Sequence, residues 1–419
     1  MLTSLIFNLN VNMSSNSTVF VQSPKSMQQF PFNIAAKLFA NKHLNATEEQ
    51  IASFQKFKQI GDPVADRLVI CMHRIGAPSR QMFSQALEYG IETLENPPQE
   101  FIDFFAIVDD MPYWVDQTRL NNATQKYQLI GEEALAIFIP GLAVSYVAPV
   151  ANHVLLRSGD LYKKAGKRAV ETFNWFNEVT APNGMNSRFG EGYKACIRIR
   201  MVHAHMRKAM NAQKDWDYQK WDQPIHQVIY TATILPFALL ATLGGNILGT
   251  IYSKQEREDI FHLWRLIAHV VGVHPSLIPT CEQDIWRLTW MELHQVFIPD
   301  ETSAMLGGAL WKSLDEILPY DQTKITARWK RKLTQNYIST LAHLMLGSEI
   351  ATSLSFPKKS VTGLTLIGGT FATNLVTTSF ARLIPQGINR LGKIKSLQRQ
   401  TLMQQIIKNT HADLSYERS

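Results

Sequence analysis

Apolar residues recur along most of this chain with the 3.6-residue period of amphipathic helices, and no pair of alternating segments joined by a tight turn predicts a β-hairpin. Thr47 with Gln50 predicts a capping box, and Gly61-Asp62-Pro63 ends the helix that follows. Ser253 with Glu256 predicts a second capping box. Further helices are expected over residues 78–95, 99–109 and 114–129, and from Thr280 onward. The pattern predicts an all-α protein.

Three stretches are hydrophobic on all sides, residues 134–156, 224–251 and 361–384. The first two approach the length that spans a membrane. Prolines and polar side chains interrupt both, which favours buried, kinked core helices that can wall a cofactor cavity. The third stretch is rich in Thr and Gly, and could lie on a membrane or be buried in the fold.

The central helix of the chain is expected over Gly192–Met210, where a histidine and two arginines lie among apolar residues. One face carries Cys196, Ile199, Arg200, His203, Met206, Arg207 and Met210. Buried guanidinium groups are costly unless each meets an anion. A haem would satisfy the face, with His203 on iron and the arginines at the propionates. A hydrogen-bonded core histidine with arginines that reach solvent remains the alternative.

The other histidines and the known catalytic motifs give no competing site. His205 lies on the opposite face of the same helix, and the remaining histidines do not form a compact set of metal ligands. No Ser–His–Asp or HExxH signature and no phosphate-binding glycine loop occurs. These observations leave the Gly192–Met210 helix as the main candidate for chemistry.

The chain has 419 residues, of which 45% are hydrophobic, enough for a large globular core. Cys71, Cys196 and Cys281 are too scattered for a disulfide framework or a metal site, which favours a reducing, cytoplasmic location. The first 20 residues lack the basic region and cleavage site of a signal peptide. The first 30 or so are rich in Ser, Asn and Gln and are expected to be weakly ordered.

Charge is uneven, because residues 324–419 hold 14 Lys+Arg and 3 Asp+Glu within a net charge of +7 for the whole chain. That basic segment, together with the apolar 361–384 stretch, predicts peripheral membrane contact. A solvated basic face is the alternative. The cluster Arg328, Lys330, Arg331 and Lys332 around Trp329 does not by itself indicate a nucleic-acid partner, and none is expected.

The order and spacing of several motifs resemble a known family. They are Arg200-x-x-His203-x-x-x-Arg207, an earlier Arg168-x-x-x-Thr172, the run Trp221-x-x-Pro224-Ile225-x-Gln227, and then Trp264 and Gly272. Over roughly residues 60–300 the chain resembles the haem-b oxygenases grouped with bacterial latex clearing protein (rubber oxygenase) and fungal MpaB.

The resemblance implies a globin-like, all-helical core around one haem b. It makes His203 the axial iron ligand, with Arg200 and Arg207 holding the haem or its propionates, and it places Arg168 and Thr172 on the distal side. It implies dioxygen as co-substrate and a hydrophobic substrate, of isoprenoid or lipid type, cleaved at a C=C bond.

Two positions depart from the family pattern. Glu171 stands where the latex enzyme has a lysine that can occupy the sixth iron position, and a carboxylate cannot act as that neutral amine ligand. The distal glutamate proposed as a base has no clear counterpart, since the comparable region holds Asn152 and His153. Glu171 could replace that base. The haem is therefore a firmer expectation than the cleavage reaction.

The sequence thus predicts three segments: a weakly ordered 1–45, a helical haem-binding oxygenase domain over 46–340, and a basic, partly apolar 341–419. Two other functions stay open, a haem-binding or sensing protein without turnover and a membrane-associated helical protein without haem.

Overall fold

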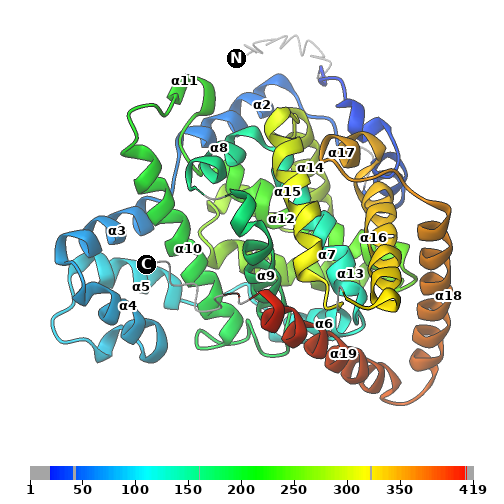
Figure 1. Ribbon diagram of the computed structural model, residues 1–419. Coiled ribbons are helices and arrows are strands. Elements are labelled where there is room, and N and C mark those ends of the chain that lie inside the picture. Colours follow the sequence, from blue (N-terminus) through cyan, green and yellow to red (C-terminus); the bar gives the residue numbers. More distant parts are fainter. Residues whose placement is uncertain (1–18, 41–43, 160, 321–322, 411, 413–419) are drawn as a thin grey trace, which may run out of the picture.

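The computed structural model describes residues 19–40, 44–159, 161–320, 323–410 and 412, without the side chains of residues 161–163. These residues form nineteen α-helices and five short 3₁₀-helices, with no strand among them. The all-α prediction is confirmed. Figure 1 shows the helices packed around a central pair of buried helices, α7 and α12.

The first nine α-helices are α1 (Phe32–Phe39), α2 (Glu48–Gln55), α3 (Pro63–Ile75), α4 (Pro78–Tyr89), α5 (Gln99–Asp109), α6 (Gln117–Gln128), α7 (Glu133–Ala143), α8 (Pro149–Arg157) and α9 (Leu161–Val179). The others are α10 (Glu191–Asn211), α11 (Tyr218–Trp221), α12 (Gln227–Ile247), α13 (Lys254–Val270), α14 (Glu282–Gln295), α15 (Glu301–Ile317), α16 (Ile325–Leu346), α17 (Ser348–Ser353), α18 (Val361–Leu383) and α19 (Gly387–Thr410). The 3₁₀-helices are η1 (Lys25–Gln28), η2 (Lys56–Gln59), η3 (Ile91–Thr93), η4 (Val144–Val147) and η5 (Pro275–Leu277).

Helix α12 is the core helix that its all-round hydrophobicity predicts. It is long and apolar enough to cross a membrane, yet 94% of its most apolar window is buried inside the protein, against α7, α13, α14 and α16. Its first turn is capped by His226, whose Nδ1 accepts a hydrogen bond from the Ile229 N–H. Burial lowers the pKa of His226 to about 3, so the ring is neutral and keeps the lone pair that this cap requires.

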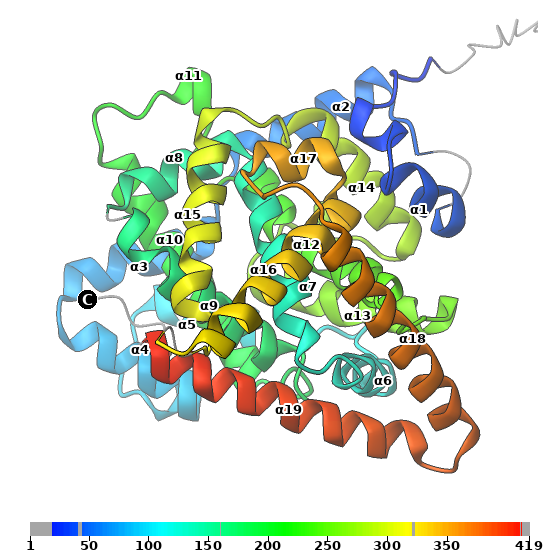
Figure 2. The ribbon, with the colours of Figure 1, turned by 45° about the vertical axis from the view of Figure 1, so that its right-hand side comes forward.

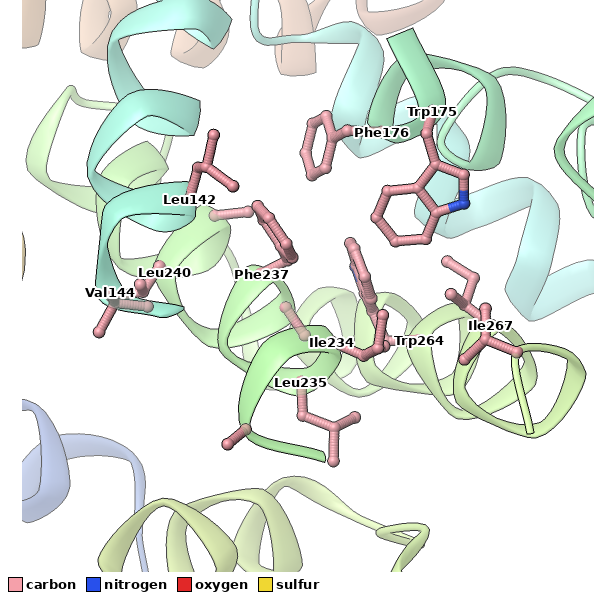
Figure 3. Packing of buried hydrophobic residues seen from close by; sticks show 14 of the residues in the cluster. Leu142, Val144, Trp175, Phe176, Ile234, Leu235, Phe237, Leu240, Trp264 and Ile267 are labelled. Atoms are coloured by element: carbon pink, nitrogen blue, oxygen red, sulfur yellow. The ribbon is translucent and has the colours of Figure 1, made fainter. Parts of the chain in front are cut away.

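Aromatic rings join α12 to its neighbours α7, α9 and α13, and Figure 3 shows the rings of α9, α12 and α13. Phe237 of α12 stacks on Trp264 of α13, with ring centroids 6.0 Å apart, and on Phe138 of α7, with centroids 5.7 Å apart. The Trp264 Nε1–H donates to the Tyr127 hydroxyl at 2.6 Å, which satisfies both polar groups inside the core. This contact fixes α6 against α13.

Both predicted capping boxes are present, at Thr47 and at Ser253. Two helix predictions were wrong in extent. The helix expected over 78–95 ends at Tyr89, because Gly90 takes φ +100°, a conformation that favours glycine. The stretch 134–156, expected as one kinked helix, is divided into α7, η4 and α8, and α8 restarts at Pro149.

The described structure continues across the segment boundaries predicted after residues 45 and 340. Residues 1–18 and 41–43 lie outside the described residues, whereas Met27 and Phe32 of the same N-terminal segment are buried in the core. The boundary expected at residue 340 falls inside α16.

Two ion pairs fix α10 to α3. Arg200 donates to both carboxylate oxygens of Asp62, at 2.6 and 3.0 Å, and both side chains are buried. Arg207, two turns later, pairs with Asp66 at 2.7 Å. Bidentate, charge-assisted bonds of this kind compensate the desolvation of a buried guanidinium and also fix its orientation.

The loops around these pairs are close-packed. Gly272 has φ +95°, and a Cβ there would lie 2.5 Å from Asp62 Oδ2 and 2.6 Å from Arg200 Nε. The Gln227 side-chain amide donates to the carbonyl oxygens of Gly61 and Gly272 and thereby ties the two loops together. The backbone at position 272 can approach the Asp62–Arg200 pair this closely because glycine has no side chain.

Helix α14 contains a fully buried acid, Glu292, which is 1% exposed. Its Oε1 has no hydrogen-bond partner among the described residues. Burial raises the pKa of Glu292 to about 8, against a smaller lowering by the Thr231 hydroxyl. The side chain is therefore uncharged at neutral pH.

Replacing this acid with its neutral isostere, Glu292→Gln, should remove a pH dependence of stability. Above about pH 4.5 the unfolded chain loses the Glu292 proton, whereas the native chain keeps it up to about pH 8. Wild-type stability should therefore fall by up to about 1.4 kcal/mol per pH unit through this group, and the variant should lack that loss. Urea unfolding at several pH values between 5 and 8 measures the difference. The exposed Glu316→Gln is the control, and parallel curves for Glu292→Gln and wild type would contradict the prediction.

The Asp62–Arg200 pair should contribute strongly to stability. Asp62→Asn keeps the Oδ1 atom that caps α3 at Ala65 N but removes the charge. The uncompensated Arg200 should then cost about 3–5 kcal/mol of unfolding free energy. Glu100→Gln, which breaks the exposed pair of Arg74 and Glu100, should cost about 1 kcal/mol or less. Denaturant titrations test both, and equal small losses would show that the buried pair has no special structural role.

Candidate functional site

One cavity lies between α10 and three other parts of the chain, and it has an empty volume of about 1310 Å³ including the part open to solvent. Segments α7 to α8 contribute Leu142, Ser145, Tyr146, Ala151, Val154, Leu155 and Ser158. Helix α9 contributes Arg168, Glu171 and Thr172, and α10 contributes Ile199, Val202, His203 and Met206. Ile225, Ile229, Tyr230 and Thr233 complete the lining. Most of these side chains are apolar, so the cavity is suited to a largely apolar ligand.

His203 is the imidazole of this cavity. Its ring meets the Tyr230 ring edge-on, with centroids 5.1 Å apart and an interplanar angle of 78°. Burial raises the pKa of Tyr230 to about 12, so its hydroxyl stays protonated at neutral pH. His203 thus lines a cavity whose other walls are mostly apolar.

The three residues expected on the distal side also line the cavity, and all come from α9. Arg168 donates from Nη2 to the Ser158 hydroxyl at 2.7 Å. The Thr172 hydroxyl donates to the Arg168 carbonyl at 2.8 Å, within its own helix. Its proton is thus used by the backbone, and Thr172 presents acceptor lone pairs to other groups. Glu171, which directly precedes Thr172 in the sequence, also lines the cavity.

Arg200 and Arg207 do not line the cavity. Their guanidinium groups turn toward α3, where Asp62 and Asp66 are the anions that the sequence argument required. The expectation that these arginines hold haem propionates therefore has no support in the described contacts. Their geometry assigns them to positioning the helix that carries His203.

Arg207 additionally holds one wall of the cavity. Its Nη1 donates to the carbonyl of Ile225 at 3.2 Å. Ile225 has φ +48°, an uncommon conformation for a β-branched residue, and its side chain lines the cavity. The Pro224-Ile225-x-Gln227 motif thus leads from a loop into the first residue of α12, and contacts with α10 and with the segment of Lys58 and Ile60 shape it.

Asn152 and His153, which stand where the family has a distal acid, do not line the cavity. The Asn152 amide donates to the Tyr146 carbonyl and to the Thr302 hydroxyl. His153 packs on Trp221, with ring centroids 4.3 Å apart, and burial lowers its pKa. Among the described residues that line the cavity, Glu171 is the acid.

Sequence reasoning missed several groups that shape the site. Asp62 and Asp66 fix α10, and the cavity's hydroxyls besides Thr172 come from Ser145, Tyr146, Ser158, Tyr230 and Thr233. In the sequence, Asp62 was interpreted only as part of a helix terminator. Asp62 and Asp66 are one helical turn apart at the start of α3, and they pair with Arg200 and Arg207 of α10. In the described part of the chain, no three His, Cys, Asp or Glu side chains are placed to share a metal ion. Cys71, Cys196 and Cys281 are free thiols.

Comparison with known proteins gives consistent similarities. The chain is 23% identical to the rubber oxygenase of Streptomyces sp. (strain K30) over 271 residues, which is 63% of this chain and 62% of the relative. The aligned part thus spans less than two thirds of that protein. The fold matches the structure of latex clearing protein LCP in the closed state with a TM-score of 0.61 at 17% identity, covering 87% of this chain and 93% of that one.

Residues 127–373 match the family described as "ER-bound oxygenase mpaB/B'/Rubber oxygenase, catalytic domain". The match begins later and ends later than the 60–300 expected from motifs, and it includes α7 to α16, all the cavity-lining residues and half of α18. The prediction of the family is confirmed: this chain belongs to the mpaB/rubber oxygenase catalytic-domain family.

Proposed function

We propose that this protein is a haem b-dependent oxygenase that uses dioxygen on a hydrophobic substrate of the isoprenoid or lipid class and cleaves a C=C bond oxidatively. The observation that carries the proposal is His203, a single imidazole that lines a mostly apolar cavity together with Arg168 in a member of an oxygenase family. The rubber oxygenase relative is named for a hydrophobic polymer. One dioxygen and one C=C bond give two carbonyl groups, so the reaction needs no added reductant.

The residues present fit a haem. His203 would hold the haem iron through an imidazole nitrogen, the contact that a haem takes from the protein. Leu142, Val154 and Met206 offer apolar surface for a macrocycle, and Arg168 is the cavity cation that can meet a carboxylate or a polarised oxygen. When bound, haem supplies the redox chemistry that activates dioxygen.

The polar residues of α9 divide the remaining work. Arg168 is a cation that lines the cavity, and it can stabilise negative charge that develops on oxygen during the reaction. Thr172, whose proton goes to its own helix, orients that arginine's backbone and accepts hydrogen bonds. Glu171 is placed to accept or return a proton at its carboxylate. The apolar walls exclude water, which strengthens these interactions.

A haem-binding protein without turnover is the second candidate. Glu171 favours it, because it stands where the latex enzyme has a lysine and no further acid lines the cavity among the described residues. Both candidates require haem at His203, and they differ in whether oxygen is consumed.

The first test is spectroscopic. The purified protein, reconstituted with haem b, should show a Soret band that shifts on reduction and with carbon monoxide. His203→Ala should lose that spectrum and bind haem at least tenfold more weakly, because it removes the axial nitrogen. His205→Ala, on the other face of α10, is the matched control and should keep it. An unchanged spectrum in His203→Ala would refute the assignment of the axial ligand, and a colourless wild type would refute haem binding.

The second test separates turnover from binding. With haem bound, Arg168→Met should lower the rate of oxygen uptake with a dispersed polyisoprenoid by about 10²–10³, the usual effect of removing a charge-stabilising donor. Thr172→Val should lower it less, because that hydroxyl already donates to the Arg168 carbonyl. Oxygen electrode traces and analysis of carbonyl products measure both. Wild-type protein that binds haem but consumes no oxygen would favour the second candidate.

A further inference from the structure

Helix α18 has its polarity reversed relative to an ordinary surface helix. It touches the protein along one narrow stripe, whose buried residues are Gly363, Ile367, Asn374, Thr378 and Ala381, mostly small or polar. Its large apolar side chains point away from the protein; Phe380 is 63% and Leu383 80% exposed. No charged residue lies on α18 before Arg382. Surface helices normally place polar residues outward, so this face is suited to an apolar environment.

The helix is nevertheless firmly attached through polar contacts on its inner side. Asn374 donates to the Leu248 carbonyl, and Lys395 of α19 donates to Asn374 Oδ1 and to Glu133. Arg382 binds the Ile251 carbonyl and Glu256. These bonds hold the helix in place while its outer apolar face stays uncovered.

The adjoining helix α19 continues the same surface with added positive charge. Its outward residues include Ile394 and Leu397, 57% and 63% exposed, beside exposed Arg390 and Lys393. Between Glu349 and Asp413 the sequence has eight Lys and Arg residues and no Asp or Glu. Figure 2 shows α18 and α19 joined at one corner and forming an outer border of the molecule.

We propose that the outer faces of α18 and α19, here called the hairpin surface, dock on an anionic lipid bilayer. The exposed apolar side chains enter the interface between headgroups and acyl chains, and the cations meet lipid phosphates and carboxylates. The attachment of α18 along its length makes it lie in the interface plane instead of crossing the bilayer. This inference goes beyond the oxygenase proposal and does not depend on it.

Charge decides between a bilayer and a second copy of this chain. A second hairpin surface would bring the exposed Arg390 and Lys393 of both copies together, and like charges repel. An anionic bilayer offers apolar depth and negative charge together, which matches both components of the surface.

The test is co-sedimentation of the full chain with vesicles of phosphatidylcholine, with and without phosphatidylserine. Wild type should bind the anionic vesicles, and added salt should weaken that binding. Phe380→Glu/Leu383→Glu should reduce the bound fraction at least tenfold. Arg390→Glu/Lys393→Glu should abolish the preference for phosphatidylserine. The matched controls lie on α3 and α4, on the side of the molecule opposite α18 in Figure 1: Ile70→Glu for the apolar pair and Arg67→Glu/Arg80→Glu for the cations. Both should bind as wild type does.

Circular dichroism and thermal unfolding confirm that each variant is folded. Wild type that stays in the supernatant with both vesicle types would overturn the proposal. So would an equal loss in the α3 and α4 controls. A wild-type dimer by light scattering that Phe380→Glu/Leu383→Glu converts to monomer, without vesicle binding, would assign the surface to a second copy. None of these readouts uses haem or oxygen, so failure here leaves the oxygenase proposal standing.

Discussion

The candidate site depends on how α10 is held by two arginine–aspartate pairs. Arg200 and Arg207 lie on either side of His203 along the helix and bind the acids of α3. Because a buried guanidinium without an anion is strongly unfavourable, these contacts restrict both the rotation and the axial position of α10. The backbone position of His203 beside the cavity is thereby fixed through its helix. The same pairs also shape the loops at Gly272 and Ile225. The two ion pairs therefore position both the helix that carries His203 and two loops near it.

Helix geometry explains why the sequence could not separate these roles. At about 100° per residue, Arg200 and Arg207 lie roughly 40–60° to one side of His203, whereas Ile199 and Met206 lie as far to the other side. A face 120° wide includes all five residues, so the sequence pattern alone predicts that each of them contacts a haem. In the structure, the Ile199 side opens on the cavity and the arginine side meets α3. Which side meets which neighbour is a tertiary fact that periodicity does not contain.

The fold was easier to predict from the sequence than the roles of the site residues. Capping boxes at Thr47 and Ser253 and the apolar 3.6-residue period depend on local interactions, and the structure confirms them. The helix break at Gly90 also has a local signal, a glycine that was passed over. The hydrophobic stretches 224–251 and 361–384 could not be told apart by hydrophobicity, yet α12 is the core and α18 lies outside it. The distinguishing feature is the inner stripe of α18, where Asn374 and Thr378 replace the large apolar residues that a buried helix needs.

With Arg200 and Arg207 neutralised outside the cavity, α9 sets the electrostatics within it. Arg168 and Glu171 are three residues apart, so they project from one side of the helix and their formal charges cancel. A cavity of low net charge tolerates an apolar substrate, while a cation and an acid at fixed positions can still stabilise charge and move a proton. A lysine at position 171 would give this wall a second cation beside Arg168. The glutamate at position 171 therefore decides the charge balance of this wall, in a cavity that His203 also lines.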